Sequence, residues 1–392
     1  MISLSTVADL TVSLCVLYAQ GRMIGLARGY AMKVSMPGFV AWILILGALG
    51  WMTSGFLLGF SAVVRRVPIH SQTAGMWHGL VFLWCACSTS AYFAWRIFQG
   101  AVKPHRFDAG RRRALEATGG ALAAVPFGVA GYGIFLERTN VGVREVDLRI
   151  ADLPPDLDGL RLVQLSDIHL SAYLSEKEFA GFVDAANELR SHVALVTGDL
   201  VSLSRDPLDA CLRQLARLRT DAGVLGCMGN HEIYAQVEEH ASREGARLGV
   251  RFLRNQCEEL RFGSAKVNFA GVDYQTFRRK DAYLAGAERL VRPGALNVLL
   301  SHNPDVFPVA ARKGFDITLA GHTHGGQINF EILQQHLNVA RFVTPYVYGV
   351  YNHERAGASP AALYVTRGIG TVGMPVRVGA PPEVALLRLR RT

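Results

Sequence analysis

The stretch Ala320-Gly-His-Thr-His-Gly-Gly-Gln327 decides the fold, because it completes a set of metal-binding side chains that begins about 150 residues earlier. Four shorter motifs precede it, each with a carboxylate, an amide or an imidazole: Asp167-Ile-His169, Gly198-Asp199, Gly229-Asn-His-Glu232 and Ser301-His302. Hard oxygen donors mixed with imidazoles suit a pair of divalent transition ions better than one structural zinc, which usually prefers four Cys or His ligands. We therefore expect a site for two divalent ions in the second half of the chain.

A short apolar run precedes most of these motifs, and each run predicts a buried β-strand. The runs occupy Leu160–Leu165, His192–Thr197, Gly223–Met228, Leu296–Leu300 and Phe315–Ala320. Two helices are predicted between the first three runs: a capping box at 175–178 opens a helix to about residue 190, and a second helix covers about 206–219. Strand, polar loop and helix in alternation predict an α/β fold with every motif at one edge of a sheet, where open α/β folds bind ligands.

The spacing within two motifs predicts which side chains act together. In Asp167-Ile-His169, residues two apart on extended backbone point to the same face, so both can bind one ion. His322 and His324 are also two apart and can face one pocket, one for each ion. The glycines that flank this last pair allow close approach of the backbone to metal or phosphate.

Four further residues receive roles from their positions after predicted strands. Asp199 follows a buried strand, where a carboxylate can bridge two cations with its oxygens. Asn230 can offer a neutral carbonyl oxygen to the second ion. His231 is one position further on and should point elsewhere, so we expect an acid or base rather than a ligand. Arg367 follows another apolar strand and is a candidate for binding substrate phosphate, with a structural arginine as the competing interpretation.

Together and in this order, the motifs resemble the calcineurin-like metallophosphoesterase superfamily, whose D-x-H, G-D, G-N-H-[DE], H and G-H-x-H blocks all occur here. The resemblance covers roughly residues 158–392. The form of the 321–327 motif, with Tyr364–Gly370 and a later Pro-Pro-Glu383, is similar to the membrane-associated bacterial branch. The resemblance implies a four-layer αββα sandwich built on two mixed sheets, with two divalent ions that are Mn, Fe, Zn or Co.

The same resemblance implies how the ligands divide between the two ions, and no ligand position departs from the family pattern. It assigns three residues to the first ion, three to the second and one to a bridge between them: Asp167, His169 and His324; Asn230, His302 and His322; and Asp199.

Two ions side by side predict hydrolysis at phosphorus. Each cation lowers the pKa of bound water, so that a bridging hydroxide forms near neutral pH and attacks phosphorus in line. We expect a hydrolase for a phosphodiester, phosphomonoester or pyrophosphate bond, with His231 protonating the leaving oxygen. Two alternatives stay open: a pyrophosphatase for a UDP-diacylglucosamine-type lipid, and a non-catalytic scaffold that keeps the fold.

The first part of the chain contains long uncharged runs. Each is long enough to cross a bilayer core, which needs about 20 apolar residues. We expect a transmembrane region over residues 1–136, with spans near 38–64, 73–95 and 115–136 and an open question over 1–21. A connector with a first, half-buried strand is expected over 137–157, followed by the catalytic domain over 158–392.

The net charge of +9 is concentrated in the first part of the chain. Residues 1–150 hold 14 Lys/Arg and 6 Asp/Glu, whereas the remainder holds 27 and 26. Basic residues between apolar runs set orientation in a membrane. The near-neutral remainder predicts no nucleic-acid-binding surface. The expected partners are a lipid bilayer and a phosphate-ester substrate, for which lipid linkage is one option.

The segment Gln99–Arg113 is the most basic loop, and the positive-inside tendency places it in the cytoplasm. The next span then leaves the cytoplasm, so the catalytic domain is expected on the outer, periplasmic or extracellular, side of a bacterial inner membrane. Gly110-Arg-Arg-Arg-Ala-Leu115 before a Gly/Ala-rich run resembles a twin-arginine export signal. A plain basic stop before a membrane helix is the alternative, and both interpretations give the same orientation.

Overall fold

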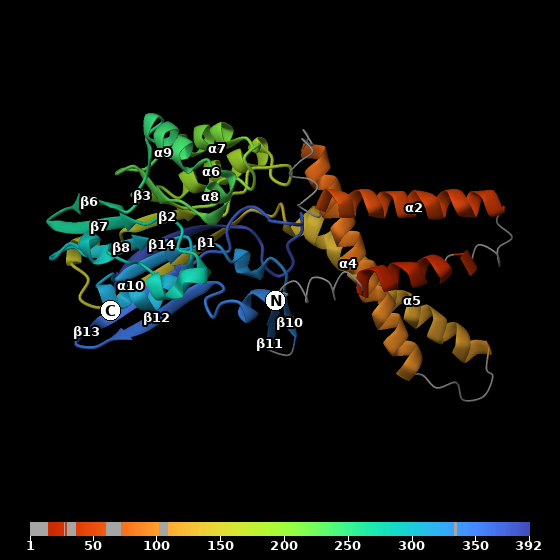
Figure 1. Ribbon diagram of the computed structural model, residues 1–392. Helices are drawn as coiled ribbons and strands as arrows, with labels where there is room; N and C mark the ends of the chain where they lie inside the picture. Colours follow the sequence, from red (N-terminus) through yellow and green to blue (C-terminus); the bar gives the residue numbers. More distant parts are fainter. Residues whose placement is uncertain (1–14, 27, 30–36, 60–71, 102–108, 333–334) are drawn as a thin grey trace. The chain divides into compact units, whose positions relative to one another are not determined.

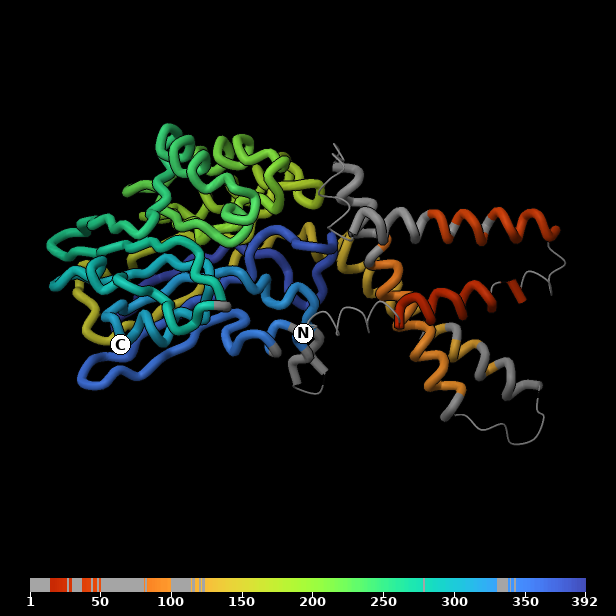
Figure 2. Tube along the Cα trace, viewed as in Figure 1, coloured from red at the N-terminus to blue at the C-terminus, as the bar shows by residue number. Residues whose placement is uncertain are grey.

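A computed structural model describes residues 15–26, 28–29, 37–59, 72–101, 109–332 and 335–392 of the 392-residue chain (Figure 1, Figure 2). The chain divides into two compact units. The helical unit comprises Met1–Ile134 and Gly373–Pro375, and the sandwich unit comprises Phe135–Val372 and Val376–Thr392.

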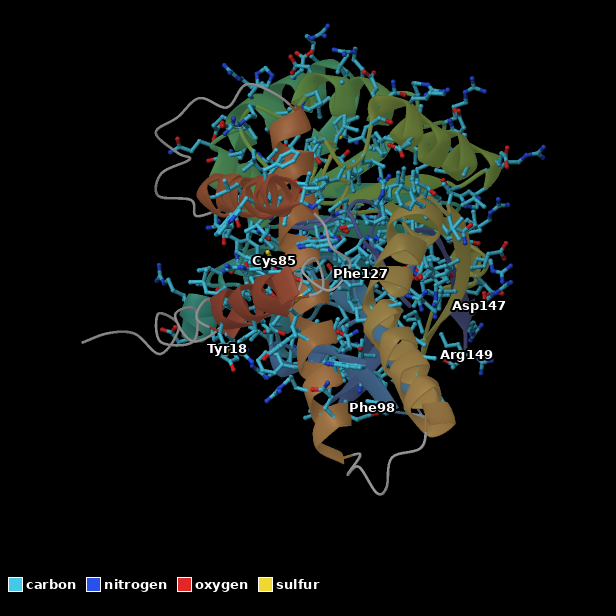
Figure 3. All side chains as sticks on the ribbon, turned by 90° about the vertical axis from the view of Figure 1, so that its right-hand side faces the viewer. Tyr18, Cys85, Phe98, Phe127, Asp147 and Arg149 are labelled. Carbon is cyan, nitrogen blue, oxygen red and sulfur yellow. The ribbon has the colours of Figure 1, made fainter. Side chains whose placement is uncertain are left out.

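Within its described residues, the helical unit contains three long helices and a helical stretch over residues 15–26. The long helices are α2 (Gly38–Gly59), α4 (Gln72–Ala101) and α5 (Ala109–Tyr132), and α4 packs against both others. Between α4 and α5, the rings of Trp84 and Phe127 lie 5.3 Å apart. Gln20 donates a hydrogen bond of 2.6 Å to the Ser88 hydroxyl of α4. Tyr18, Cys85 and Phe127 mark these neighbouring helices (Figure 3).

The three expected membrane spans all fall on these helices, but hydropathy singles out one of them. Among the described residues, one stretch, Ala117–Glu137, is long and apolar enough to cross a bilayer. Gly38–Gly47 is a shorter apolar stretch. Most of the 1–21 candidate and the last residues of the 38–64 span lie outside the described residues.

The sandwich unit contains a first sheet of six strands in the order β1-β14-β2-β3-β4-β5. β1 is parallel to β14, β14 is antiparallel to β2, and β2 to β5 are parallel to one another. The strands are Gly142–Ile150 (β1), Arg161–Leu165 (β2), Val193–Thr197 (β3), Val224–Cys227 (β4), Val250–Phe252 (β5) and Glu383–Arg391 (β14). The half-buried strand expected within the connector over 137–157 corresponds to β1, which joins the first sheet beside β14.

A second sheet of six strands has the order β12-β13-β9-β8-β7-β6 and is also mixed. Its strands are Gln256–Phe262 (β6), Ala265–Gly271 (β7), Leu296–Leu300 (β8), Ile317–Ala320 (β9), Gly349–Arg355 (β12) and Ala358–Val365 (β13). A separate hairpin pairs Asn329–Ile332 (β10) with Gln335–Asn338 (β11). All five apolar runs that predict strands are strands in the structure.

Helices cover the outer face of each sheet, and apolar side chains fill the space between the sheets. Phe179 and its neighbours on the helices above the first sheet form one core (Figure 1). Leu195 of β3 and Ile317 of β9 meet in the core between the two sheets. Phe307 and Leu363 belong to a core on the outer face of the second sheet. The order of layers is therefore helices, sheet, sheet, helices.

The helices of the sandwich unit are short, and the first begins with the predicted capping box. Ser175 accepts from the Glu178 amide, and the Glu178 carboxylate accepts from the Ser175 amide. The helices are Glu176–Glu188 (α6), Leu208–Leu215 (α7), Asn230–Ala235 (α8), Glu238–Arg247 (α9) and Phe307–Lys313 (α10). A π-helical turn, Gly133–Glu137 (η1), leads into the unit, and short 3-10 turns occupy Pro155–Leu157, Phe277–Ala282, Ala287–Leu290, Pro304–Val306, His324–Gly326 and Val339–Phe342.

Candidate metal centre

The seven predicted metal ligands come together where loops of the two sheets meet. Five loops supply them: those after β2, β3 and β4 of the first sheet and after β8 and β9 of the second. The prediction of a single sheet edge is therefore wrong in this respect, because the ligands come from both sheets. Two sheets that face each other let the site receive side chains from opposite directions.

Asp167, His169 and His324 form the first group, with their ligand atoms within 4.8 Å of one another. Nε2 of His324 lies 3.4 Å from Oδ1 of Asp167. The rings of His169 and His324 stack with centroids 5.0 Å apart. These three residues are the set that the family resemblance implies for one ion.

Asp199, His302 and His322 form the second group. Nε2 of His302 lies 3.0 Å from Oδ2 of Asp199 and 3.1 Å from Nδ1 of His322. The same Asp199 oxygen lies 3.5 Å from Nε2 of His169, which belongs to the first group. Oδ2 of Asp199 is thus placed between the two groups, as a bridging ligand requires.

Asn230 and His231 begin α8 and both lie at the site. Asn230 is buried, and its Oδ1 has no hydrogen-bond partner. The ring centroid of His231 lies 4.7 Å from that of His169. One ring nitrogen of His231 also lies within 4.8 Å of ligand atoms of His169 and Asp199, so these three residues form a third group. The expectation that His231 points elsewhere is therefore wrong, because the start of a helix turns consecutive residues toward the same pocket.

The backbone at the site is not extended as the spacing argument assumes. Five of the seven predicted ligands have φ between +46° and +74°, in the left-handed region that residues other than glycine seldom adopt: Asp167, His169, Asp199, His322 and His324. Asp167 and His169 reach one group because of these tight loop conformations, not because they alternate along a strand. Such conformations cost about 1–3 kcal/mol each and cluster at functional sites.

Two glycines leave room for the carboxylates. A Cβ atom at Gly321 would lie 2.2 Å from Oδ2 of Asp167, and one at Gly229 would lie 2.1 Å from Oδ1 of Asp199. Any side chain at either position would displace an acidic oxygen of the site. The glycines of the motifs therefore serve close packing around the ligand atoms.

The donor set fits divalent cations. Asp167 is fully buried and Asp199 is 2% exposed, and burying a carboxylate is costly unless it is paired or binds a metal. Oδ2 of Asp167, Nε2 of His169 and Oδ1 of Asn230 are buried atoms without a hydrogen-bond partner. Mixed oxygen and imidazole donors suit Mn, Fe, Zn and Co. The orphaned atoms are thus satisfied if the site holds metal.

Electrostatics favour positive charge beside Asp199. Burial alone would lower the pKa of His302, but the charge of Asp199 and the hydrogen bond to it raise that pKa to about 10. Burial works to raise the pKa of Asp199, yet His302 and His169 hold it well below its usual value. A cation that binds here takes the place of a proton on His302, so binding releases protons.

Glu232 holds two of the ligand loops together. Its buried carboxylate accepts hydrogen bonds from the backbone amides of Asp199 (2.9 Å), Leu200 (2.7 Å) and Gly229 (2.8 Å). These bonds connect the loop after β3 to the loop after β4. Glu232 ends the motif Gly229-Asn-His-Glu232, but its position in the sequence does not indicate this role.

Arg377 was missed by sequence analysis and is fully buried beside the site. Its guanidinium donates to the carbonyls of Gly370 (3.1 Å), Ala380 (2.8 Å) and Arg367 (3.0 Å), and it lies 3.5 Å from Nδ1 of His324. Burial lowers its pKa to about 10, so it remains charged at neutral pH. A single arginine among apolar neighbours in the sequence does not indicate a role at the site. In the structure, Arg377 joins the loop after β13 to His324.

Ser202 contacts two of the site histidines. Its hydroxyl lies 2.9 Å from Nδ1 of His169, and its carbonyl lies 2.9 Å from Nδ1 of His231. Because a carbonyl only accepts, Nδ1 of His231 carries a proton and Nε2 is the basic nitrogen of the neutral ring. Nothing in the sequence marked this serine.

Arg367 packs against the loop that carries His324. A Cβ atom at Gly325 would lie 2.9 Å from Cγ of Arg367. The guanidinium of Arg367 lies over the Tyr348 ring, 4.5 Å from the ring centroid. Nε of Arg367 has no hydrogen-bond partner, and Oε2 of Glu383 lies 3.9 Å from it. The predicted role in binding substrate phosphate remains a prediction.

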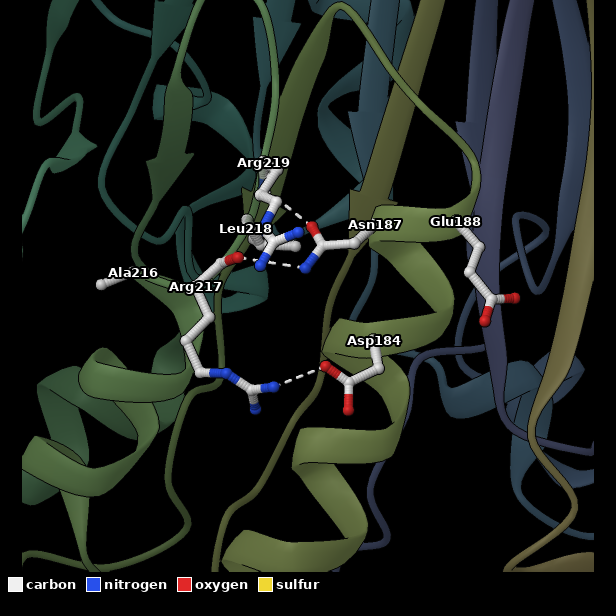
Figure 4. A pocket seen from close by; sticks show the side chains of 7 residues that line it. All are labelled: Asp184, Asn187, Glu188, Ala216, Arg217, Leu218 and Arg219. Carbon is white, nitrogen blue, oxygen red and sulfur yellow. Dashed lines mark hydrogen bonds and ion pairs between the residues drawn. The ribbon is translucent and has the colours of Figure 1, made fainter.

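A surface hollow of about 530 Å³ lies away from these residues, between the end of α6 and the segment after α7 (Figure 4). Two sets of contacts join its walls: Arg217 pairs with Asp184 at 2.5 Å, and Asn187 bonds the Arg217 carbonyl and the Arg219 amide. The hollow shares no residue with the metal centre.

Known proteins are similar to this chain over the region that holds the metal centre. Residues 160–326 match the family described as Calcineurin-like phosphoesterase. The chain is 28% identical over 288 residues to the uncharacterized metallophosphoesterase YkuE of Bacillus subtilis, covering 72% of this chain and 98% of that protein. It is 28% identical over 327 residues to an uncharacterized metallophosphoesterase of Helicobacter pylori strain J99, covering 79% and 82%.

A relative from an animal is also similar. The transmembrane protein with metallophosphoesterase domain of Bos taurus is 30% identical over 264 residues, which cover 63% of this chain and 57% of the bovine protein. The chain thus spans little more than half of that relative.

Replacing Glu232 tests whether the joined loops matter for metal binding. Glu232→Gln turns one acceptor oxygen into a donor that faces a backbone amide, so we expect the affinity for Mn²⁺ to fall about 10–100-fold. Isothermal titration calorimetry measures it. Glu239→Gln, which removes an exposed partner of Arg254, serves as control and should bind Mn²⁺ like the unmodified chain. Unchanged affinity in Glu232→Gln would show that this carboxylate does not position the site.

Proposed function

We propose that the chain is a calcineurin-like metallophosphoesterase that hydrolyses phosphoric esters as a dinuclear enzyme anchored in a membrane. The match of residues 160–326 to that family and the similarity to bacterial metallophosphoesterases support the proposal. The observation that carries the proposal is the convergence of buried carboxylates and imidazoles from both sheets. A phosphodiester, phosphomonoester or pyrophosphate substrate is consistent with such a site.

Seven residues would hold the two ions. We assign three to each ion and one to both: Asp167, His169 and His324; Asn230, His302 and His322; and Asp199 as the bridge. When bound, two divalent ions supply Lewis-acid stabilisation of phosphoryl oxygens and an activated water. The protein's own contribution is a rigid, buried cradle, which the hydrogen bonds of Glu232 and Arg377 hold in place.

His231 is proposed to exchange a proton with the leaving oxygen. Its Nδ1 donates to the Ser202 carbonyl, which leaves Nε2 as the reactive nitrogen. Its ring lies beside His169, and its ligand atom lies within 4.8 Å of those of His169 and of the proposed bridge Asp199. Arg367 is proposed to contact a phosphate oxygen, since its stacking on Tyr348 fixes the guanidinium near the His324 loop.

Anchoring is proposed to rest on Ala117–Glu137, with the other uncharged runs as further spans. The basic segment 99–113 precedes this stretch, so the positive-inside tendency places the sandwich unit on the outer side of the membrane. Bovine and zebrafish relatives carry the description of transmembrane proteins with a metallophosphoesterase domain, which supports an anchored arrangement.

A scaffold without activity is the competing function. Buried atoms of Asp167, His169 and Asn230 that lack partners argue against it, because a protein that binds no metal gains nothing from them. The assay below separates the two functions.

Hydrolysis of bis(4-nitrophenyl) phosphate with added Mn²⁺ tests the proposed activity. We expect release of 4-nitrophenolate that stops on addition of EDTA and returns with excess Mn²⁺. Asp199→Ala removes the bridge, so it should lose both ions in elemental analysis together with the activity. Asp209→Ala, at an exposed carboxylate paired with His240, is the matched control and should keep both. An active, metal-loaded Asp199→Ala would disprove the bridging role.

His231→Ala tests the proton-transfer role. We expect two ions per chain to remain bound while kcat falls about 10²–10⁴-fold, the usual contribution of a positioned acid or base. His240→Ala, an exposed histidine, should behave like the unmodified chain. A His231→Ala variant that keeps near-normal kcat, or that loses metal, would contradict the assignment.

Orientation can be measured through Cys257, which is partly exposed in β6. In spheroplasts we expect a membrane-impermeant maleimide to label the unmodified chain more than Cys257→Ser, since the sandwich unit is proposed to lie outside. Labelling that appears only after permeabilisation would place the unit in the cytoplasm.

A further inference from the structure

The chain enters the sandwich unit at the edge of the first sheet that carries the metal centre. Gly142, the first residue of β1, pairs with Glu383 of β14, while Gln164 near the end of β2 pairs with Ala385. The start of β1 is therefore level with the end of β2, where Asp167 follows. Strands lie about 4.8 Å apart, so two strand spacings separate these points by about 10 Å.

The candidate membrane span ends just before this point. Ala117–Glu137 stops five residues before Gly142, a distance of about 17 Å at full extension. Within the sandwich unit, Phe135 and Leu136 are 76% and 62% exposed. The span therefore ends at the same edge of the unit as the site.

Arg138 fixes the end of the span to a ligand-bearing loop. Its guanidinium donates to the carbonyl of Tyr173, four residues after His169, and lies 3.6 Å from the Glu178 carboxylate. Arginines at the ends of membrane helices extend toward the headgroup layer while their apolar stems remain in lipid. The loop after β2 is thus held close to the level at which the span leaves the hydrocarbon.

Exposed apolar side chains occupy three other segments around the site. Leu203, 54% exposed, follows the serine that contacts His169 and His231. Tyr234, 64% exposed, has its ring 5.8 Å from that of His231. Val372, 36% exposed, is bonded through its backbone to the side chain of Gln327 in the last motif. We call Leu203, Tyr234 and Val372 the site rim. Single exposed apolar residues are ordinary, but several beside one site mark an interaction surface.

We propose that the site rim rests in the headgroup layer of the bilayer, and that the substrate is an amphiphile whose phosphate ester reaches the metal centre while its acyl chains stay in the membrane. The lipid surface is the occupant that fits, because the span of the same chain ends at this edge. The inference rests on the proposed function for the reaction and the anchor, and adds the direction from which the substrate arrives. A tyrosine in the rim suits this layer, where aromatic side chains with a polar tip are enriched.

Lipid contact of the rim can be measured without any activity. Cys15→Ser and Cys257→Ser remove the cysteines that are not buried, and Leu203→Cys or Tyr234→Cys then carries an environment-sensitive NBD label. In proteoliposomes with lipids that bear a nitroxide near the headgroup, we expect strong quenching at both positions. Ala356→Cys is the control, because its turn between β12 and β13 is exposed and lies at the opposite edge of the second sheet. Equal quenching at 203, 234 and 356 would overturn the proposal.

The substrate class is tested by comparing two esters that release the same product. Hexadecyl 4-nitrophenyl phosphate in vesicles presents an amphiphile, and bis(4-nitrophenyl) phosphate a soluble ester. Leu203→Asp introduces a charge at the rim, so the ratio of the rate on the amphiphile to that on the soluble ester should fall at least tenfold. Leu203→Met, which keeps the side chain apolar, should preserve the ratio. An unchanged ratio in Leu203→Asp would refute delivery from the membrane. Failure to hydrolyse either ester would refute the proposed function and leave the quenching result to stand alone.

Discussion

Burial of two carboxylates among imidazoles is the constraint on which the rest of the sandwich unit depends. Asp167 and Asp199 are almost completely withdrawn from water, and an uncompensated buried charge costs several kcal/mol. Backbone amides offset part of this cost by donating hydrogen bonds to the carboxylates. The amide of His322 donates to Asp167 at 2.8 Å, and the amide of His231 donates to Asp199 at 2.9 Å. Strained loop conformations, glycines without room for a Cβ and the Glu232 carboxylate all follow from the need to hold these oxygens in place.

Much of this arrangement could be predicted from the sequence, for a physical reason. Buried strands consist of apolar runs, and a polar residue directly after such a run lies at the end of a strand. The positions of β2, β3, β4, β8 and β9 could therefore be predicted from the sequence. The half-buried strand expected within residues 137–157 likewise corresponds to β1. What alternation does not encode is which strands share a sheet. The partition into two sheets depends on long-range pairing, such as β13 with β9, and local pattern carries no information about it.

The errors at the site have a common origin in local backbone geometry. The spacing of Asp167 and His169 predicts a shared face only on extended backbone, and the prediction for His231 holds only if neighbouring residues point apart. The loop is left-handed at both ends of the first motif, and α8 begins at Asn230, so neither assumption holds. Arg377 escaped prediction because its partners are carbonyl groups, which every residue possesses and no sequence distinguishes.

The position of β14 bears on how the protein is made. It lies between β1 and β2, and the pairing of Gly142 with Glu383 closes a loop of about 240 residues. During synthesis, β1 and β2 leave the ribosome long before their shared neighbour exists, so the first sheet has an open seam until residues 383–391 emerge. Pairing over such a separation is slow and leaves strand edges exposed to wrong partners. The Glu383 side chain also accepts hydrogen bonds from the hydroxyls of Tyr364 and Thr366, so β14 completes both the first sheet and the segment beside the metal loops.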